Sequence, residues 1–330
     1  MKTTTKSQIV EYIKESGQSS PRQITDFLKI SSQAVHRQLK KLSEENKIVK
    51  IGSAPNVYYK ISEYKKYKIE LDLTTSEENF FEKNYLYISP QGKILYGAEG
   101  FKSWVDANKQ THMIRKLADE YLDMRKKYDE YFEDKIKMIE ASKKFKDTFD
   151  DCQLDHVYYS DFYSLPKFGK TKMGNLVLYA KQSQNIKLIN EVADQVSDSI
   201  ARLIKIHKID AVAWAPHSLP RKIPFLIQIR KKLKLNLPEI IFLKAYSGQV
   251  PIAQKSLSKL EERIDNAENT IYPKENKSAS KRVLIFDDAV GSGATLQAIA
   301  GKLKKINPKV ITIGYAIVGS LKGFEVIKEV

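Results

Sequence analysis

The sequence has a single cysteine, Cys152, among its 330 residues. That excludes a disulfide framework and a zinc site built from several cysteines. Long apolar runs are also missing: runs such as residues 283–286 are far shorter than the roughly 20 residues of a membrane-spanning helix. The first residues contain no apolar signal-peptide core. These absences predict a cytoplasmic protein that does not enter a membrane.

Positive charge is abundant and unevenly distributed. The 56 Lys and Arg residues against 40 Asp and Glu residues give a net charge of +16. Residues 1–61 carry +6, residues 62–180 carry −1 and residues 181–330 carry +11. A basic excess at both ends indicates two regions that face polyanions, and a generally lysine-rich surface is the alternative.

Residues 1–61 contain three helical patterns followed by a two-stranded one. Helices are expected over about residues 5–16, from Ser20-Pro21 to about Leu28, and from Ser31 or Ser32 onward. Serine is a favoured N-cap, and proline suits the first helical position. The third helix would bury Val35, Leu39 and Leu42, and a strand hairpin is expected over residues 48–51 and 57–61.

This order of elements resembles the winged helix-turn-helix domain of bacterial regulators. Such a domain places one helix in the major groove, where polar side chains reach base edges and lysines contact phosphates. A wing that binds or dimerises with protein remains the alternative to DNA or RNA contact. The candidate nucleic-acid-binding residues are Gln33, His36, Arg37, Lys40, Lys41 and Lys50.

Residues 66–175 form a middle region between the predicted winged helix (residues 1–65) and a third domain. A small hairpin is expected over residues 85–89 and 94–96, and a long, charge-dense helical stretch over residues 111–149. The apolar stripe of that stretch has heptad spacing, which favours packing on its own chain over a dimeric coiled coil. An acidic cluster (Asp147, Asp150, Asp151 and Asp155) matches no coordination loop, so we predict no metal site there.

From about residue 176 the pattern alternates between helices and strands. Helices are expected over residues 186–207, 224–235 and 294–306, and strands over residues 210–215, 239–243, 282–286 and 310–318. This alternation predicts an α/β domain with a parallel sheet that helices cover on both faces.

The sharpest motif follows the apolar strand at residues 283–286. It reads Asp287-Asp288-Ala289-Val290-Gly291-Ser292-Gly293-Ala294-Thr295, and a helix begins at its end. Backbone N–H groups at a glycine-rich turn and a helix N-terminus suit a phosphate. Two acceptor-only carboxylates at a strand end suit the vicinal hydroxyls of a ribose.

This string resembles the phosphoribosyl pyrophosphate (PRPP) signature of type I phosphoribosyltransferases. The resemblance implies a Rossmann-like domain over residues 176–330, with Asp287 and Asp288 on the ribose hydroxyls and residues 289–295 around the 5-phosphate. It also implies that Mg²⁺ arrives with PRPP. One departure is Gly291, where the family often has a hydroxyl residue.

More of the domain resembles the ComF-like subgroup of this family. The resemblance includes Lys181, expected just before a helix, and a strand-end loop at residues 215–221, whose His217 and Ser218 would contact the ligand. Arg221 and Lys244 are the catalytic candidates, because a leaving pyrophosphate needs its charge neutralised. Residues 245–280 show little regular patterning and are interpreted as a lid, with Lys255 and Arg263 as further cations. The subgroup's zinc knuckle is missing.

Three functions fit these patterns. The first is an effector enzyme of a multicomponent system. Such an enzyme would resemble the winged-helix phosphoribosyltransferase-like proteins that accompany some retrons, and its partner would be a protein or a nucleic acid. Alternatively, the chain is a PRPP-responsive DNA-binding regulator, resembling the purine-operon repressor of Gram-positive bacteria. The third possibility is an ordinary phosphoribosyltransferase. The sequence does not predict which acceptor would receive the ribose 5-phosphate, and all three functions are compatible with a homodimer.

Overall fold

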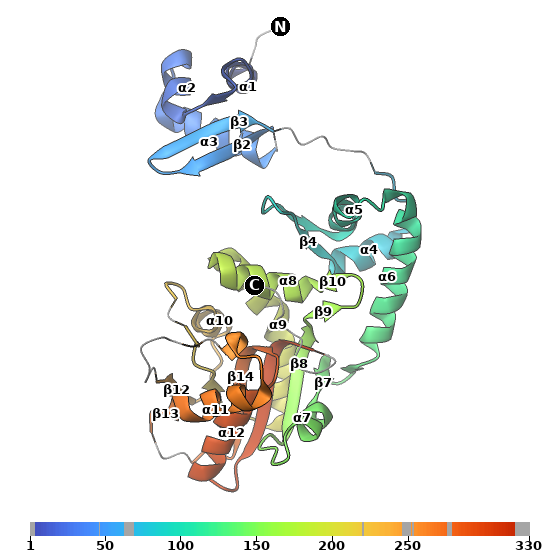
Figure 1. The fold of residues 1–330 in the computed structure, drawn as a ribbon, viewed down its shortest axis with the longest axis vertical. Helices are drawn as coiled ribbons and strands as arrows, with labels where there is room; N and C mark the ends of the chain where they lie inside the picture. Colours follow the sequence, from blue (N-terminus) through green and yellow to red (C-terminus); the bar gives the residue numbers. More distant parts are fainter. Residues whose placement is uncertain are drawn as a thin grey trace. The chain divides into compact units, whose positions relative to one another are not determined.

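The computed structural model describes residues 4–45, 47–62, 69–219, 221–245, 252, 254–275 and 279–320. The chain forms two compact units, Met1–Glu70 and Leu71–Val330. Figure 1 shows the elements of each unit. Among the residues described, no helix is long and apolar enough to cross a membrane.

The first unit has the predicted three helices and wing. Its helices are α1 (Thr5–Ser16), α2 (Pro21–Leu28) and α3 (Ser32–Glu44), and its strands are β1 (Gln18–Ser19), β2 (Ile48–Ser53) and β3 (Asn56–Ile61). Ser20 caps α2 in a capping box with Gln23, and Ser31 caps α3. The fully buried core comprises Ile9, Ile13, Ile24, Val35, Leu39 and Leu42. Capping and apolar spacing therefore predicted this unit correctly.

An eight-stranded sheet organises the second unit. Its order is β13-β12-β11-β14-β15-β8-β7-β6. The five central strands are parallel, whereas β13 and the β7–β6 pair run antiparallel at the two edges. The strands are β6 (Phe132–Glu133), β7 (Met138–Glu140), β8 (His156–Phe162), β11 (Ala211–Trp214), β12 (Glu239–Lys244), β13 (Ile271–Pro273), β14 (Arg282–Val290) and β15 (Ile311–Gly319). The predicted α/β class with a largely parallel sheet is confirmed.

Helices cover both faces of this sheet, as predicted. One face packs on α8 (Lys172–Ser183), α9 (Ile186–His207) and α10 (Phe225–Leu233). The other packs on α7 (Ser142–Thr148), α11 (Leu260–Thr270) and α12 (Ala294–Ile306). Because strand side chains alternate between faces, Leu284 and Phe286 join the α8–α10 core, while Val283 and Ile285 join the α12 core.

The segment before the sheet is helical and aromatic. It contains α4 (Thr75–Asn84), β4 (Leu86–Ile88), β5 (Ile94–Tyr96), α5 (Gly97–Ala107), the 3₁₀ turn Thr111–Met113 and α6 (Ile114–Asp129). A small antiparallel pair, β9 (Ser164–Leu165) and β10 (Gly169–Lys170), precedes α8. The hairpin β4–β5 is tied to α8 and α9, because Asn175 Nδ2 donates to the Leu86 carbonyl at 2.8 Å and the Tyr96 hydroxyl donates to Glu191 at 2.9 Å.

The expected long helix over residues 111–149 is wrong in its second half. Helix α6 ends at Asp129, and β6, β7 and α7 follow. Lys137 has a φ of 60°, a turn conformation, and it leads into Met138 and Ile139, which are buried beside β8. Tyr121 stacks on Phe81 at 5.3 Å, so the first half of the apolar stripe packs within its own chain.

Two other expectations change. The segment 245–280 contains the helix α11 and the strand β13, because its apolar residues Ala267 and Ile271 pack into the α12 core. The sheet takes strands from both sides of the boundary expected at residue 175, and that boundary falls inside α8. Strand β8, which the sequence reading missed, lies between β15 and β7.

Candidate functional site

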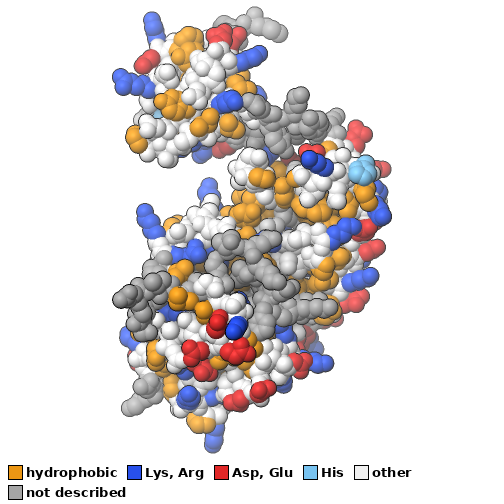
Figure 2. Space-filling view, viewed as in Figure 1, with side chains coloured by type: hydrophobic (Ala, Val, Ile, Leu, Met, Phe, Trp, Pro, Cys, Tyr) orange, Lys and Arg blue, Asp and Glu red, His pale blue; other side chains and the backbone are white. Residues whose placement is uncertain are grey.

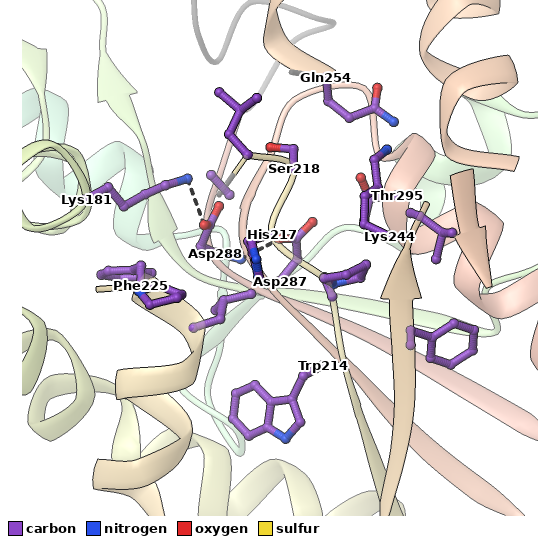
Figure 3. Close-up of a pocket in the computed structure, with 18 of the residues that line it drawn as sticks. Lys181, Trp214, His217, Ser218, Phe225, Lys244, Gln254, Asp287, Asp288 and Thr295 are labelled. Carbon is purple, nitrogen blue, oxygen red and sulfur yellow. Dashed lines mark hydrogen bonds and ion pairs between the residues drawn. The ribbon is translucent and has the colours of Figure 1, made fainter. Parts of the chain in front are cut away.

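A cavity of about 640 Å³ lies at the carboxyl ends of the parallel strands β11, β12 and β14 (Figure 3). Open α/β sheets bind ligands at this edge. Every candidate predicted for the ligand or for catalysis lines it: His217, Ser218, Arg221, Lys244, Asp287, Asp288, Ala289, Val290, Gly291, Ser292, Gly293, Ala294 and Thr295. The structure thus brings together residues that are up to 78 positions apart in the sequence.

The end of β11 explains why the acidic pair faces this cavity. The sequence predicted that this strand ends just before the carboxylates. Strand β14 instead continues to Val290 beside β15. Its other neighbour, β11, ends at Trp214, which lies opposite Phe286. Beyond Phe286, therefore, β14 is paired along β15 while its other edge opens at the position of Asp287 and Asp288.

The two carboxylates have different surroundings. Asp288 forms an ion pair with Lys181 of α8, with 2.7 Å between Nζ and Oδ2 (Figure 3). Asp287 accepts a hydrogen bond from the Asp288 backbone N–H at 2.8 Å. Burial, together with the negative charge of Asp288, raises the pKa of Asp287 to about 7. The pair therefore holds more negative charge than its surroundings neutralise, and hydroxyl donors or a cation would relieve it.

The glycine-rich loop packs closely against α7 at Gly293. Gly293 has a φ of +83° and is the N-cap of α12. A Cβ atom built at Gly293 would lie 2.4 Å from Cε1 of Phe145 in α7. Glycine is required here for both its conformation and its lack of a side chain. The Ala294 N–H donates to the Ser292 hydroxyl at 3.3 Å, and the start of α12 offers an anion the positive end of a helix.

The two catalytic candidates line the cavity from different elements. Arg221 donates to the Lys181 carbonyl at 2.6 Å, which fixes it at the end of α8. Lys244 donates to Asn266 Oδ1 at 2.9 Å and to Thr270 Oγ1 at 2.5 Å, both in α11. Burial lowers the pKa of Lys244 to about 8. Both cations are thus positioned toward a space that suits an anionic leaving group.

Among the described residues of the segment interpreted as a lid, Gln254, Arg263 and Ile271 line the cavity. Gln254 Nε2 donates to the Arg263 carbonyl at 3.1 Å. Within the residues described, the buried Oε1 of Gln254 has no hydrogen-bond partner. Burial lowers the pKa of Arg263. The side chain of Lys255 lies outside the described part of the chain.

Several cavity residues were not proposed as site residues from the sequence. Lys181 appeared only within the ComF-like resemblance, and its ion pair with Asp288 depends on α8 packing over β14. Trp214 packs against Phe286 with 4.4 Å between ring centroids and an angle of 30° between the ring planes. In the sequence, the position of Trp214 at the end of a predicted buried strand was the only indication that it could line a site. The ion pair between Arg230 and Glu239 at the cavity wall joins the consecutive elements α10 and β12, and the sequence analysis did not propose it.

The donor set of the cavity suits Mg²⁺ only as part of a ligand complex. Carboxylate oxygens are the ligands that Mg²⁺ prefers, and the raised pKa of Asp287 marks a place where positive charge is short. Yet the described residues contain no group of three or more acidic, His or Cys side chains that could hold a metal. A magnesium ion here would need oxygens from the bound ligand.

The nucleic-acid candidates occupy a separate surface, on the first unit. Gln33, His36, Arg37, Lys40 and Lys41 are all exposed on α3, opposite the buried stripe of Val35, Leu39 and Leu42. Lys50 is exposed on β2 of the wing. Figure 2 shows Lys and Arg side chains spread over this unit. The predicted basic helix face is therefore present and accessible within the unit.

Comparisons with known proteins bear on both units. Residues 2–49 match the family model described as "Winged helix-turn-helix DNA-binding", so the first unit is a winged helix-turn-helix domain. The chain is structurally similar to a hypoxanthine phosphoribosyltransferase from Staphylococcus aureus, at 16% sequence identity and a TM-score of 0.25. That similarity covers 41% of this chain and 65% of the neighbour, slightly under two thirds of its length. No curated protein matches the chain.

Proposed function

We propose that the cavity binds PRPP and that the protein is phosphoribosyltransferase-like. The observation that carries this is the junction of β14 and α12, where two carboxylates and a glycine-rich anion loop face one cavity. Asp287 and Asp288 would accept hydrogen bonds from the ribose 2′ and 3′ hydroxyls. Residues 291–295 would hold the 5-phosphate through backbone N–H groups and the hydroxyls of Ser292 and Thr295.

The same geometry supports transfer of ribose 5-phosphate. In such a step the bond between C1 and the pyrophosphate oxygen breaks, and its electron pair leaves with pyrophosphate. The acceptor then forms a new bond to C1 and loses its proton. Arg221 and Lys244 would neutralise the leaving pyrophosphate. Mg²⁺, when bound with PRPP, supplies further charge neutralisation.

Ligand binding also has a consequence for Lys181. Its amino group pairs with Asp288 at 2.7 Å, which occupies a carboxylate that the ribose would use. A ribose at Asp288 would compete with that ion pair and leave Lys181 available for the phosphates. Because Arg221 is held by the Lys181 carbonyl, the ribose position and the pyrophosphate loop share one anchoring residue.

The test is calorimetric titration of PRPP with Mg²⁺ into the wild type and into Asp287→Asn/Asp288→Asn. Binding by the wild type and its loss in the variant would support the proposal. The chain offers a matched control in Asp150→Asn/Asp151→Asn, a second acidic pair that is exposed and outside the cavity. The control should bind as the wild type does. A wild type without measurable binding, or equal binding by all three proteins, would overturn the proposal.

A PRPP-responsive DNA-binding regulator is the second candidate, and the winged helix-turn-helix unit favours it. A regulator would bind a specific DNA sequence with an affinity that changes when PRPP is added. An enzyme, in contrast, would release pyrophosphate from PRPP when offered an acceptor base. Selection of bound DNA from a random pool, followed by titration with and without PRPP, separates the two. The effector of a retron-type system would release pyrophosphate only with its partner present.

A further inference from the structure

Helix α7 lies directly beneath the glycine-rich loop, on the face of the sheet that also carries α12. Phe145 of α7 fills the space where a side chain of Gly293 would be. The preceding residue, Lys144, donates from Nζ to the Ser320 carbonyl at 2.9 Å and to the Ser320 hydroxyl at 2.8 Å. One short helix therefore contacts both the loop and the end of the neighbouring strand.

The register of the sheet places Lys144 near the start of the loop. Val290 pairs with Gly319, so Ser320 and Gly291 are the next residues along the two strands. The amino group held on Ser320 therefore lies at the end of β15, next to the point where the loop leaves β14. Lys144 does not line the cavity itself. It thus approaches the anion loop from behind.

The neighbours of Lys144 in α7 show that its position is specific. Lys143 and Lys146 are exposed, whereas Lys144 is partly buried. Burial lowers the pKa of Lys144 to about 8. A dianion bound in the adjacent loop would stabilise the charged form of this amino group.

We propose that α7 belongs to the phosphate-binding site, with Phe145 fixing the loop and Lys144 supplying positive charge behind it. The identity of the phosphate as the 5-phosphate of PRPP rests on the proposed function. This assigns a role in ligand binding to a segment that precedes the PRPP motif by about 140 residues in the sequence. Lys144 acts on the ligand through the loop, so it is a positioning residue.

The test compares Lys144→Met, Lys144→Arg and the matched control Lys143→Met. The probes are inorganic phosphate, ribose 5-phosphate and PRPP, titrated calorimetrically. We expect Lys144→Met to bind all three about tenfold more weakly, which is about 1.4 kcal/mol. Lys144→Arg should recover most of that loss, and Lys143→Met should match the wild type. Equal affinities for Lys144→Met and the wild type would overturn the inference.

A second measurement on the wild type avoids any folding defect of the variant. Acetylation of each lysine is followed by peptide mass spectrometry with and without inorganic phosphate. Phosphate should slow acetylation of Lys144 at least threefold and leave Lys143 and Lys146 unchanged, because the charged amine does not react. Equal slowing of all three lysines, or of none, would contradict the inference.

These probes also separate the inference from the proposed function. A wild type that binds inorganic phosphate in a Lys144-dependent way but does not bind PRPP supports the inference and overturns the proposed ligand. A wild type that binds PRPP with no contribution from Lys144 supports the ligand and overturns the inference. A wild type that binds none of the probes overturns both.

Discussion

Replacing Asp287 by asparagine should make the protein more stable at neutral pH while it removes one of the two carboxylates proposed to bind ribose. Burial and the charge of Asp288 raise the pKa of Asp287 to about 7, against a reference value of 3.8. Between these two values the folded chain keeps a proton that the unfolded chain releases. The wild type therefore loses stability as the pH rises from about 4 to about 7. Asparagine carries no charge at any pH and escapes this loss.

The size of the effect follows from the shift. About three pKa units at about 1.4 kcal/mol each give an upper bound of about 4 kcal/mol at pH 8. Because Asp287 is only partly buried, solvent screening reduces this, and we expect about 2 kcal/mol. For a domain of this size that corresponds to a rise of about 4–8 °C in the melting temperature.

Thermal melts of the wild type and Asp287→Asn at pH 5, 6, 7 and 8 provide the assay. The gap between the two proteins should widen from pH 5 to about pH 7 and then level off. Asp150→Asn, an exposed change outside the cavity, should show no such widening. A gap that is constant across this range, or a variant that melts below the wild type at pH 8, would refute the electrostatic account of the pair.

Three further predictions concern other parts of the chain. Gly293→Ala should lower the free energy of unfolding by about 1–3 kcal/mol, measured by urea denaturation. When Phe145→Ala is already present, Gly293→Ala should cost less, but it should still cost something because the φ of +83° remains. Asp155→Ala should destabilise by about 1–2 kcal/mol at pH 7, because Thr312 loses its acceptor. Burial raises the pKa of Asp155, but hydrogen bonds from Thr312 outweigh it and the net shift is downward, so this loss should shrink in melts as the pH falls below about 4. Arg37→Ala should weaken DNA binding in gel shifts and reduce the salt slope by about one, with PRPP binding unchanged; full DNA affinity would contradict the assigned helix face.

Local signals in the sequence predicted the first unit and the acidic, glycine-rich motif at the cavity. Serine caps, a proline at the first turn and an apolar stripe act within a few residues, so α2 and α3 begin where expected. The motif at residues 287–295 is equally local, and all of it lines the cavity. Short-range physics was sufficient for both.

Contacts between segments that are distant in the sequence were harder to predict. The apolar stripe of residues 114–131 continues the helical pattern past Asp129, yet the chain turns there because Met138 and Ile139 gain a place in the sheet beside β8. Lys181 and Asp288 are 107 positions apart, and their ion pair requires α8 to pack over β14. No periodicity within either segment encodes that contact. The same holds for Lys144 and Ser320, which meet only when α7 and β15 are both in place.

The cost of the acidic pair argues for a ligand rather than for a structural role. Two adjacent carboxylates at a strand end raise the pKa of one of them to about 7, and the packing of β14 against β15 would be served as well by uncharged residues. Groups that are kept in an unfavourable state cluster at functional sites. Here the acidic pair stands beside a loop that requires glycine at Gly293 and beside three cations, Lys181, Arg221 and Lys244. A ligand that brings hydroxyl donors to the carboxylates, and phosphates to the loop and the cations, would stabilise the acidic pair and the cations at once.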